Sequence, residues 1–221
     1  IVSGSAMAAM LAKKKGEYEA IRNGLPPWLL FFVIGGYEYY PEEKVAYQEK
    51  EMQDAAKRLN LNPSSAVGGV SAYEVLRLVS GPSEEPYWKL RYKGGCQDIF
   101  FLTTMDKAPK FVDVMNEVAV QCGFPTSDIG VYIQPMVQGT CCHVEFELYY
   151  DAKNAKEVAK VQDVYSRASE ALMNAGGFFN RPYGAWADMA YRRDGETTAA
   201  LRKVKGIFDP NNIMNAGKLC F

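Results

Sequence analysis

CCHVEFELYYD, residues 141–151, is the stretch that decides the fold. Its side chains alternate with a period of two, as they do in a β-strand that buries one face in a core. The face expected in the core carries Cys142, Val144, Phe146 and Leu148. The opposite face carries Cys141, His143, Glu145, Glu147 and Tyr149. We therefore expect a strand with one buried side and one polar side.

The neighbouring residues extend this strand into a sheet with helices. GVYIQPMVQG, residues 130–139, precedes it as a second strand, joined by a tight turn that contains glycine. DIFFLTT, residues 98–104, is a third strand, and apolar residues recur at helical spacing over 107–122 and 155–175. The order strand–helix–strand–strand–helix predicts an α+β fold, a ferredoxin-like antiparallel sheet with helices packed on one face.

Flanking segments complete the expected organisation. A C-terminal helical segment is predicted from short helices at 183–193 and 196–205, and upstream helices are predicted at 5–22 and 41–60. WLLFFVIGGY, residues 28–37, is a continuous apolar run that predicts a central strand covered on both sides. Residues 61–95 are rich in turn signals and are interpreted as an excursion rather than a separate domain.

Composition limits the classes of partner. The chain has 221 residues, 48% of them apolar, and a formal net charge of −1. Lysine and arginine are scattered except in AKKKG, residues 12–16, so nucleic-acid binding has no electrostatic footprint. No apolar run approaches the roughly 20 residues that span a bilayer. We therefore expect neither nucleic acid nor a membrane among the partners.

Cysteine usage and the first residue bear on the origin of the chain. The five cysteines are Cys96, Cys122, Cys141, Cys142 and Cys220. They form no metal-binding spacing, and an odd number without a secretory signal favours reduced thiols and a cytoplasmic protein. The chain starts at Ile1 rather than methionine, which we interpret as a trimmed start or a fragment of a longer protein.

The polar strand face holds the first candidate site. His143 is the single histidine of the chain and lies beside Glu145 and Glu147 on that face. It is either a hydrogen-bonded residue on a solvated sheet face or part of a site floor. In a site, a neighbouring carboxylate would suit the imidazole to proton transfer.

A loop between helices holds the second candidate. FFNRPYGAW, residues 178–186, places Arg181 among aromatic residues in a segment bounded by glycine and proline. A guanidinium in this setting either binds a planar anion such as a carboxylate or phenolate, or packs on Tyr183 or Trp186. Tyr183, Trp186 and Ala190 are at helical spacing, which favours a place in the core.

Two motifs carry a resemblance to a known family. LRKVKGIFDPNNIMNAGKL, residues 201–219, resembles the carboxyl-terminal signature of FAD-linked oxidases of the vanillyl-alcohol oxidase and p-cresol methylhydroxylase superfamily, with Ala216 where proline is common. YKGGCQDIFFLTT, residues 92–104, resembles the strand that enters the cap domain of those enzymes. FFNRPYGAW corresponds to their aromatic-arginine segment at the substrate. The likeness covers about residues 25–221.

The resemblance implies a cofactor and a division of the chain. FAD would be held mainly by a domain absent from this chain, with Asn215, Gly217 and Lys218 as the cofactor-binding residues here. Residues 1–24 would be a helix and linker from that missing domain, 25–180 the substrate cap, and 181–221 a segment that docks back onto the FAD domain. The chain would then be an incomplete, inactive part of an FAD-dependent oxidoreductase, and homo-oligomer formation stays open.

The resemblance also suggests substrates. The leading hypothesis is oxidation of a para-substituted phenol by hydride transfer to flavin, in which Arg181 and Tyr183 stabilise the phenolate and His143 or Glu145 handles the proton. Relatives that oxidise D-lactate or 2-hydroxyglutarate hold a metal with two histidines and a carboxylate, and one histidine cannot form that site. A 2-hydroxy acid dehydrogenase cap and a stand-alone ligand- or partner-binding module remain the alternatives.

Overall fold

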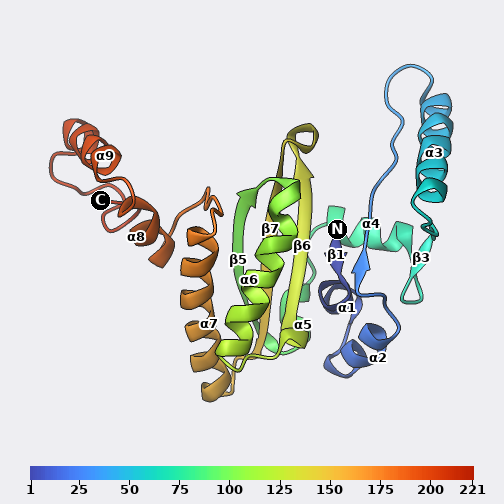
Figure 1. The fold of residues 1–221 in the computed structure, drawn as a ribbon, viewed down its shortest axis with the longest axis horizontal. Coiled ribbons are helices and arrows are strands. Elements are labelled where there is room, and N and C mark those ends of the chain that lie inside the picture. Colours follow the sequence, from blue (N-terminus) through green and yellow to red (C-terminus); the bar gives the residue numbers. More distant parts are fainter. The chain divides into compact units, whose positions relative to one another are not determined.

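Three strands form the antiparallel sheet of the second half of the chain in the computed structural model (Figure 1). The structure describes residues 1–221, apart from the side chain of Lys15. The chain divides into two units, Ile1–Tyr92 and Lys93–Phe221.

The sheet of the second unit has β7 (Cys141–Asp151) at its centre. β7 pairs antiparallel with β5 (Gly94–Thr103) on one side and with β6 (Ile129–Met136) on the other. The predicted strands at 98–104, 130–139 and 141–151 are therefore present. A short 3₁₀ turn, Val137–Gly139, connects β6 to β7, and Gly139 has a φ of 80° there.

A fourth extended segment completes the topology. After α7 (Ala155–Asn174), the chain returns to β5 through an isolated antiparallel bridge between Phe178 and Leu102. The two residues exchange backbone hydrogen bonds of 2.8 and 2.9 Å. The spatial order is thus the Phe178 segment, β5, β7 and β6, which is the strand order of a ferredoxin-like fold. The predicted α+β class is confirmed.

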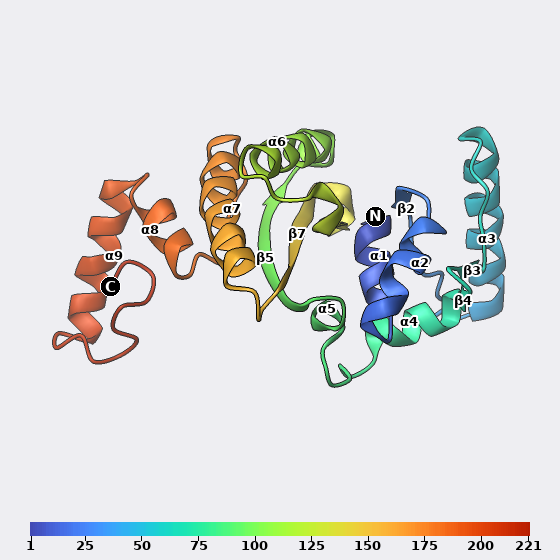
Figure 2. The same cartoon turned by 90° about the horizontal axis from the view of Figure 1, so that it is seen from below.

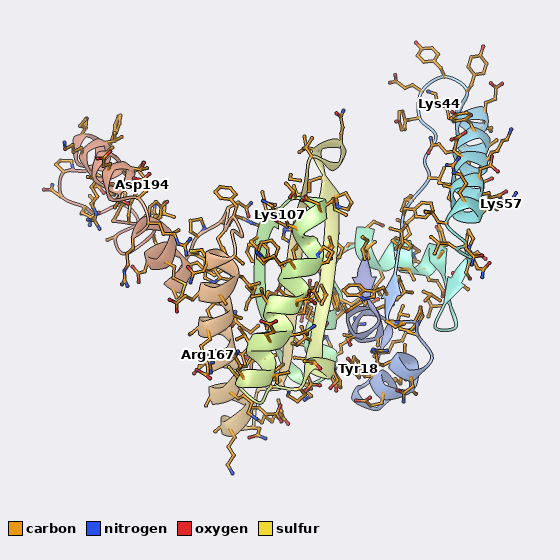
Figure 3. The ribbon with its side chains drawn as sticks, in the orientation of Figure 1. Tyr18, Lys44, Lys57, Lys107, Arg167 and Asp194 are labelled. Carbon is orange, nitrogen blue, oxygen red and sulfur yellow. The ribbon has the colours of Figure 1, made fainter. Side chains whose placement is uncertain are left out.

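The core of this unit lies between the sheet and two helices. α6 (Ala108–Gln121) and α7 cover the same face of the sheet (Figures 1 and 2). The buried apolar residues of this layer include Ile99, Phe101, Phe111, Met115, Val144, Phe146, Leu148, Val164 and Leu172. Arg167 of α7, labelled in Figure 3, donates to the side-chain oxygen of Gln121 at 3.1 Å and links the two helices at the surface.

The C-terminal helical segment consists of α8 (Ala185–Tyr191) and α9 (Gly195–Phe208). Asp194, labelled in Figure 3, caps α9 because its carboxylate accepts the backbone N–H of Thr197 at 2.9 Å. Both helices were expected, at 183–193 and 196–205. After α9 the chain turns back on that helix. Its last residues therefore contact α9, within the same unit.

The first unit is built from short elements. It contains β1 (Val2–Ser3), α1 (Gly4–Leu11), a 3₁₀ turn at Lys15–Glu17, α2 (Tyr18–Asn23), β2 (Trp28–Leu29), α3 (Pro41–Arg58), β3 (Ala66–Val67), β4 (Val70–Ser71), α4 (Ala72–Ser80) and α5 (Trp88–Arg91). Tyr18, labelled in Figure 3, stacks on Tyr92 with 3.6 Å between ring centroids. Ser71 and Glu74 form a capping box at the start of α4.

The predicted helix over 5–22 is broken in two. α1 ends at Leu11, and Ala12 has extended backbone angles. The carboxylate of Glu17 accepts the backbone N–H groups of Lys13 and Lys14, at 2.9 and 3.3 Å. These bonds satisfy the donors that begin a new helical segment, so the chain restarts its helix instead of continuing it.

The prediction of a buried central strand over 28–37 was wrong. Only Trp28–Leu29 forms a strand, and its partner β1 has two residues, so the ladder ends there. Beyond it the apolar side chains are exposed: Leu30 by 61%, Val33 by 57% and Tyr37 by 74%. An apolar run has the composition of a buried strand, but a strand forms only where another strand of the same length pairs with it.

Candidate functional site

The sheet of the second unit has one face in the core and one face that carries the candidate residues. Strand register places Phe101, Val144 and Ile133 opposite one another on the core face. On the other face it places Phe100, Glu145 and Tyr132 in one row, and Leu102, His143 and Gln134 in the next. Pairing therefore brings aromatic residues from both neighbouring strands to the sides of the His143–Glu145 pair.

His143 and Glu145 contact each other directly. Nε2 of His143 lies 3.0 Å from a carboxylate oxygen of Glu145, and both side chains are mostly shielded, with 12% and 18% of their surface exposed. The rings of Phe100 and Tyr132 lie 5.8 and 6.1 Å from the imidazole. The expected placement of His143 beside a carboxylate is therefore present, in a partly dry environment.

The rest of this face is less exposed than a solvated sheet surface. Glu147 is 2% exposed and Tyr149 is fully buried, and the hydroxyl of Tyr149 donates to the Glu147 carboxylate. The alternation of β7 thus gives a polar face that is half-buried at His143 and buried toward Asp151. This face of β7 is therefore not uniformly solvated.

Arg181 reaches the same face from the loop after α7. Its guanidinium carbon lies 4.5 Å from the centre of the Phe100 ring, which is a cation–π contact. Tyr183 lies 6.2 Å from Phe100, ring centre to ring centre. Both Arg181 and Tyr183 are exposed, so a ligand can reach them. Phe100 therefore lies next to both candidate groups, Arg181 of the loop and His143 of the strand.

Trp186 anchors the loop that carries Arg181. Its ring is fully buried, and its Nε1–H donates to the hydroxyl of Ser169 in α7 at 2.7 Å. The ring also contacts Phe100 and Tyr183, with centroids 5.1 and 5.0 Å away. At the other end of the loop, the Phe178–Leu102 bridge holds the chain against β5. Arg181 therefore lies in a loop that is fixed at both ends.

Burial and nearby charges change the pKa values of Tyr132 and Tyr183, the two tyrosines of the site. Burial raises the pKa of Tyr132, and the carboxylate of Glu145 raises it further. Burial also raises the pKa of Tyr183; Asp98 and Glu145 add to this rise, and Arg181 opposes it. Both phenols therefore keep their protons at neutral pH and act as hydrogen-bond donors.

The predicted cofactor-binding residues lie elsewhere in the unit. Asn215, Gly217 and Lys218 are exposed in the turn after α9. Asn215 and Gly217 have φ values of 54° and 73°. The turn is held by α9, where Arg202 donates to the Cys220 carbonyl at 2.8 Å. The structure thus groups these three residues with α9 and not with His143 and Arg181 on the sheet face.

Asp209 organises this C-terminal turn. Its carboxylate accepts the backbone N–H groups of Ile213 and Met214, at 3.0 and 2.8 Å, and pairs with Lys205. These contacts lower the pKa of Asp209 to about 2, chiefly through the hydrogen bond with Lys205. Asp209 and Pro210 therefore begin a folded turn that is built around one carboxylate.

Sequence reasoning missed Phe100, Tyr132 and the anchoring role of Trp186. Phe100 and Tyr132 lie on strands that were predicted, and period two separates them from the core residues. What was missing was the register that places them beside Glu145. The core position expected for Trp186 is correct, whereas Tyr183 precedes α8 and is 51% exposed.

The described residues offer neither a metal-binding cluster nor a membrane-spanning helix. Among the residues that the structure describes, no three His, Cys, Asp or Glu side chains gather in a group that could hold a metal ion. In the same part of the chain, no helix has the length and apolar character to cross a membrane.

The described residues fit part of the requirements for FAD. The face around Phe100 is partly apolar and aromatic and suits contact with a flat ring, and the turn at Asn215–Lys218 is exposed. Within the described chain, no glycine-rich loop between a strand and a helix could hold a pyrophosphate. The described residues thus offer an aromatic surface that a flat ring could contact but no phosphate-binding loop.

Comparison with known proteins relates part of the chain to a protein family. No curated protein matches the chain significantly. A family model does match residues 139–219, from the start of β7 through α7, α8 and α9 to the C-terminal turn. This range contains His143, Glu145, Arg181 and Tyr183. The matched family is FAD linked oxidases, C-terminal domain, and the match supports an FAD-dependent oxidoreductase.

Proposed function

We propose that this chain is the substrate-binding cap of an FAD-dependent oxidoreductase of the vanillyl-alcohol oxidase and p-cresol methylhydroxylase type, and that its substrate is a para-substituted phenol. One observation carries the proposal: Arg181 and the His143–Glu145 pair both lie next to the same partly buried ring, Phe100. A cation, an aromatic surface and a proton-accepting group are the three features that a phenol requires to bind and ionise.

The binding step uses Arg181 and Phe100. A phenol ring would lie against the aromatic surface, with its oxygen toward the guanidinium, which stabilises the negative charge of a phenolate. Tyr183 keeps its proton because its pKa is raised, so its hydroxyl can donate a second hydrogen bond to the same oxygen. His143 or Glu145 would accept the phenol proton.

FAD, when bound, supplies the hydride acceptor for the benzylic carbon of the substrate. We propose that FAD is held mainly by a domain outside these 221 residues, that residues 181–221 dock onto that domain, and that Asn215, Gly217 and Lys218 contact the cofactor. Exposed apolar residues in this region support docking: Ile207, Phe208, Ile213, Met214 and Leu219. On this proposal the chain alone is inactive.

An absorbance experiment tests the proposal. The 221-residue chain and the chain extended by its upstream coding sequence are purified identically, supplied with FAD and compared by visible spectrum. We expect a colourless short chain and a yellow extended protein. Under anaerobic conditions, 4-cresol should then bleach the yellow protein and D-lactate should not.

The other outcomes identify the alternatives. Bleaching by D-lactate instead of 4-cresol would overturn the phenol assignment in favour of a 2-hydroxy acid dehydrogenase, in which Arg181 would hold the carboxylate. If both proteins stay colourless, the flavoenzyme proposal fails and a stand-alone ligand- or partner-binding module replaces it.

A further inference from the structure

The two ring nitrogens of His143 have different environments. Nε2 lies 3.0 Å from Glu145, whereas Nδ1 has no hydrogen-bond partner among the residues that the structure describes. Within that same set of residues, every fully buried side-chain nitrogen and oxygen has a partner. Nδ1 is therefore not fully buried, in keeping with the 12% of the His143 side chain that is exposed.

Packing holds the imidazole in this orientation. His143 and Glu145 are two residues apart on β7, so both side chains leave the same face. The Phe100 and Tyr132 rings lie on either side in the neighbouring strands. Most of both side chains is shielded from water. The hydrogen bond between them is therefore stronger than the same bond in an exposed pair.

The other titratable groups around the site are poor proton acceptors for a phenol. Tyr132 and Tyr183 keep their protons, because burial and carboxylate charge raise the pKa of each. Arg181 is a permanent cation. Asp98 and Glu145 carry carboxylates, whose ordinary pKa lies far below that of a phenol. Histidine is the side-chain type that exchanges protons near neutral pH.

We infer that Glu145 is a positioning residue, which accepts the Nε2–H of His143 and leaves Nδ1 as the atom that takes the proton of a bound phenol. The inference rests on the proposed phenol substrate. In the step, the phenol O–H bond breaks and a bond between Nδ1 and hydrogen forms. The phenolate is balanced by Arg181 and the imidazolium by Glu145, so no further reactant is required.

The single histidine makes a direct test possible. The 221-residue chain is labelled with ¹⁵N in its histidine ring, and NMR spectra then contain one imidazole that needs no assignment. At alkaline pH we expect the ring proton on Nε2, protected from exchange with water. Adding 4-cresol should shift the Nδ1 resonance more than the Nε2 resonance.

Three variants separate positioning from general stability. Glu145→Gln should speed exchange of the Nε2 proton by at least about tenfold, because a hydrogen bond to a charged acceptor is lost. Glu145→Asp keeps the charge but shortens the side chain, so it should also lose protection. Glu117→Gln, at an exposed position of α6, should leave the imidazole spectrum unchanged.

Specific results would overturn the inference. These are a ring proton on Nδ1 in the unmodified chain, unchanged exchange in Glu145→Gln, or an Nδ1 resonance that does not respond to 4-cresol. No flavin takes part in this experiment. A failure of 4-cresol to bleach the flavin would therefore leave the NMR result standing, and the reverse also holds.

Discussion

Arg181 lies over Phe100, with its guanidinium carbon 4.5 Å from the ring centre, although the two residues come from a loop and a strand far apart in the sequence. The contact joins the loop after α7 to the sheet face that carries His143 and Glu145. A cation held on an aromatic surface keeps its charge available to a ligand while its position is restricted. This relationship makes the loop and the sheet one candidate site.

Replacing Arg181 should impair both binding and turnover in the complete, flavin-loaded enzyme. We expect Arg181→Ala to lower kcat/KM for 4-cresol by about 10²-fold or more, because charge stabilisation of the phenolate is lost. Arg181→Lys should recover only part of the loss, since lysine lacks the planar fork. Steady-state kinetics measure this, with Lys110→Ala at an exposed position of α6 as the control. Unchanged kinetics in Arg181→Ala would remove the residue from the site.

Ser169→Ala should destabilise the second unit. The substitution leaves the buried Nε1–H of Trp186 without its acceptor, which costs about 1–3 kcal/mol. Thermal or urea unfolding monitored by circular dichroism measures the change. Ser166→Ala, at an exposed position of the same helix, should have little effect. Equal stability of the two variants would show that the hydrogen bond between Trp186 and Ser169 contributes nothing to stability.

Gly177→Ala should disturb the segment that leads to Arg181. A Cβ at this position would lie 2.9 Å from the Phe101 ring and 3.0 Å from the Leu172 carbonyl oxygen. Because Phe101 is fully buried, the chain would have to shift at the Phe178–Leu102 bridge. We expect a loss of about 1–3 kcal/mol of stability, as for other overpacked core sites.

The matched control is Gly206→Ala in α9. An added Cβ there meets no atom within 4 Å, so the substitution should be neutral or stabilise by about 0.5–1 kcal/mol. Amide exchange at Leu102 and Phe178 should become faster only in Gly177→Ala. The same exchange rates in both variants would contradict the packing argument.

The C-terminal turn should loosen in acid as Asp209 gains a proton. Its pKa in the folded chain is about 2, below the ordinary 3.8, so the charged carboxylate is the form that stabilises the turn. That stabilisation is complete above the ordinary pKa and disappears as pH falls through about 2. The backbone amide resonances of Ile213 and Met214 should shift together with this midpoint.

Asp209→Asn supplies the control for the acid transition. Asparagine keeps a carbonyl acceptor but cannot titrate, so the two amide resonances should lose their pH dependence between about 2 and 4. A titration midpoint near the ordinary value in the unmodified chain would show that the turn does not depend on the charge of Asp209.

Local patterns in the sequence determined most elements of the second unit. The alternation over 141–151, the helical periodicities over 107–122 and 155–175 and the capped start of α9 each depend on neighbours along the chain, so they could be predicted from the residues alone. The same patterns placed His143 and Glu145 on one strand face, because a period of two is a property of the strand itself.

Long-range pairing decided what lies around that face. The central position of β7, the register that brings Phe100 and Tyr132 to Glu145 and the bridge that returns Phe178 to β5 all join distant segments. The apolar run at 28–37 shows the converse, since its strand ends where its partner ends. The sequence alone therefore determined which residues share a face, through local periodicity. Only the tertiary structure decided which faces meet, because hydrogen-bond partners and close packing come from elsewhere in the chain.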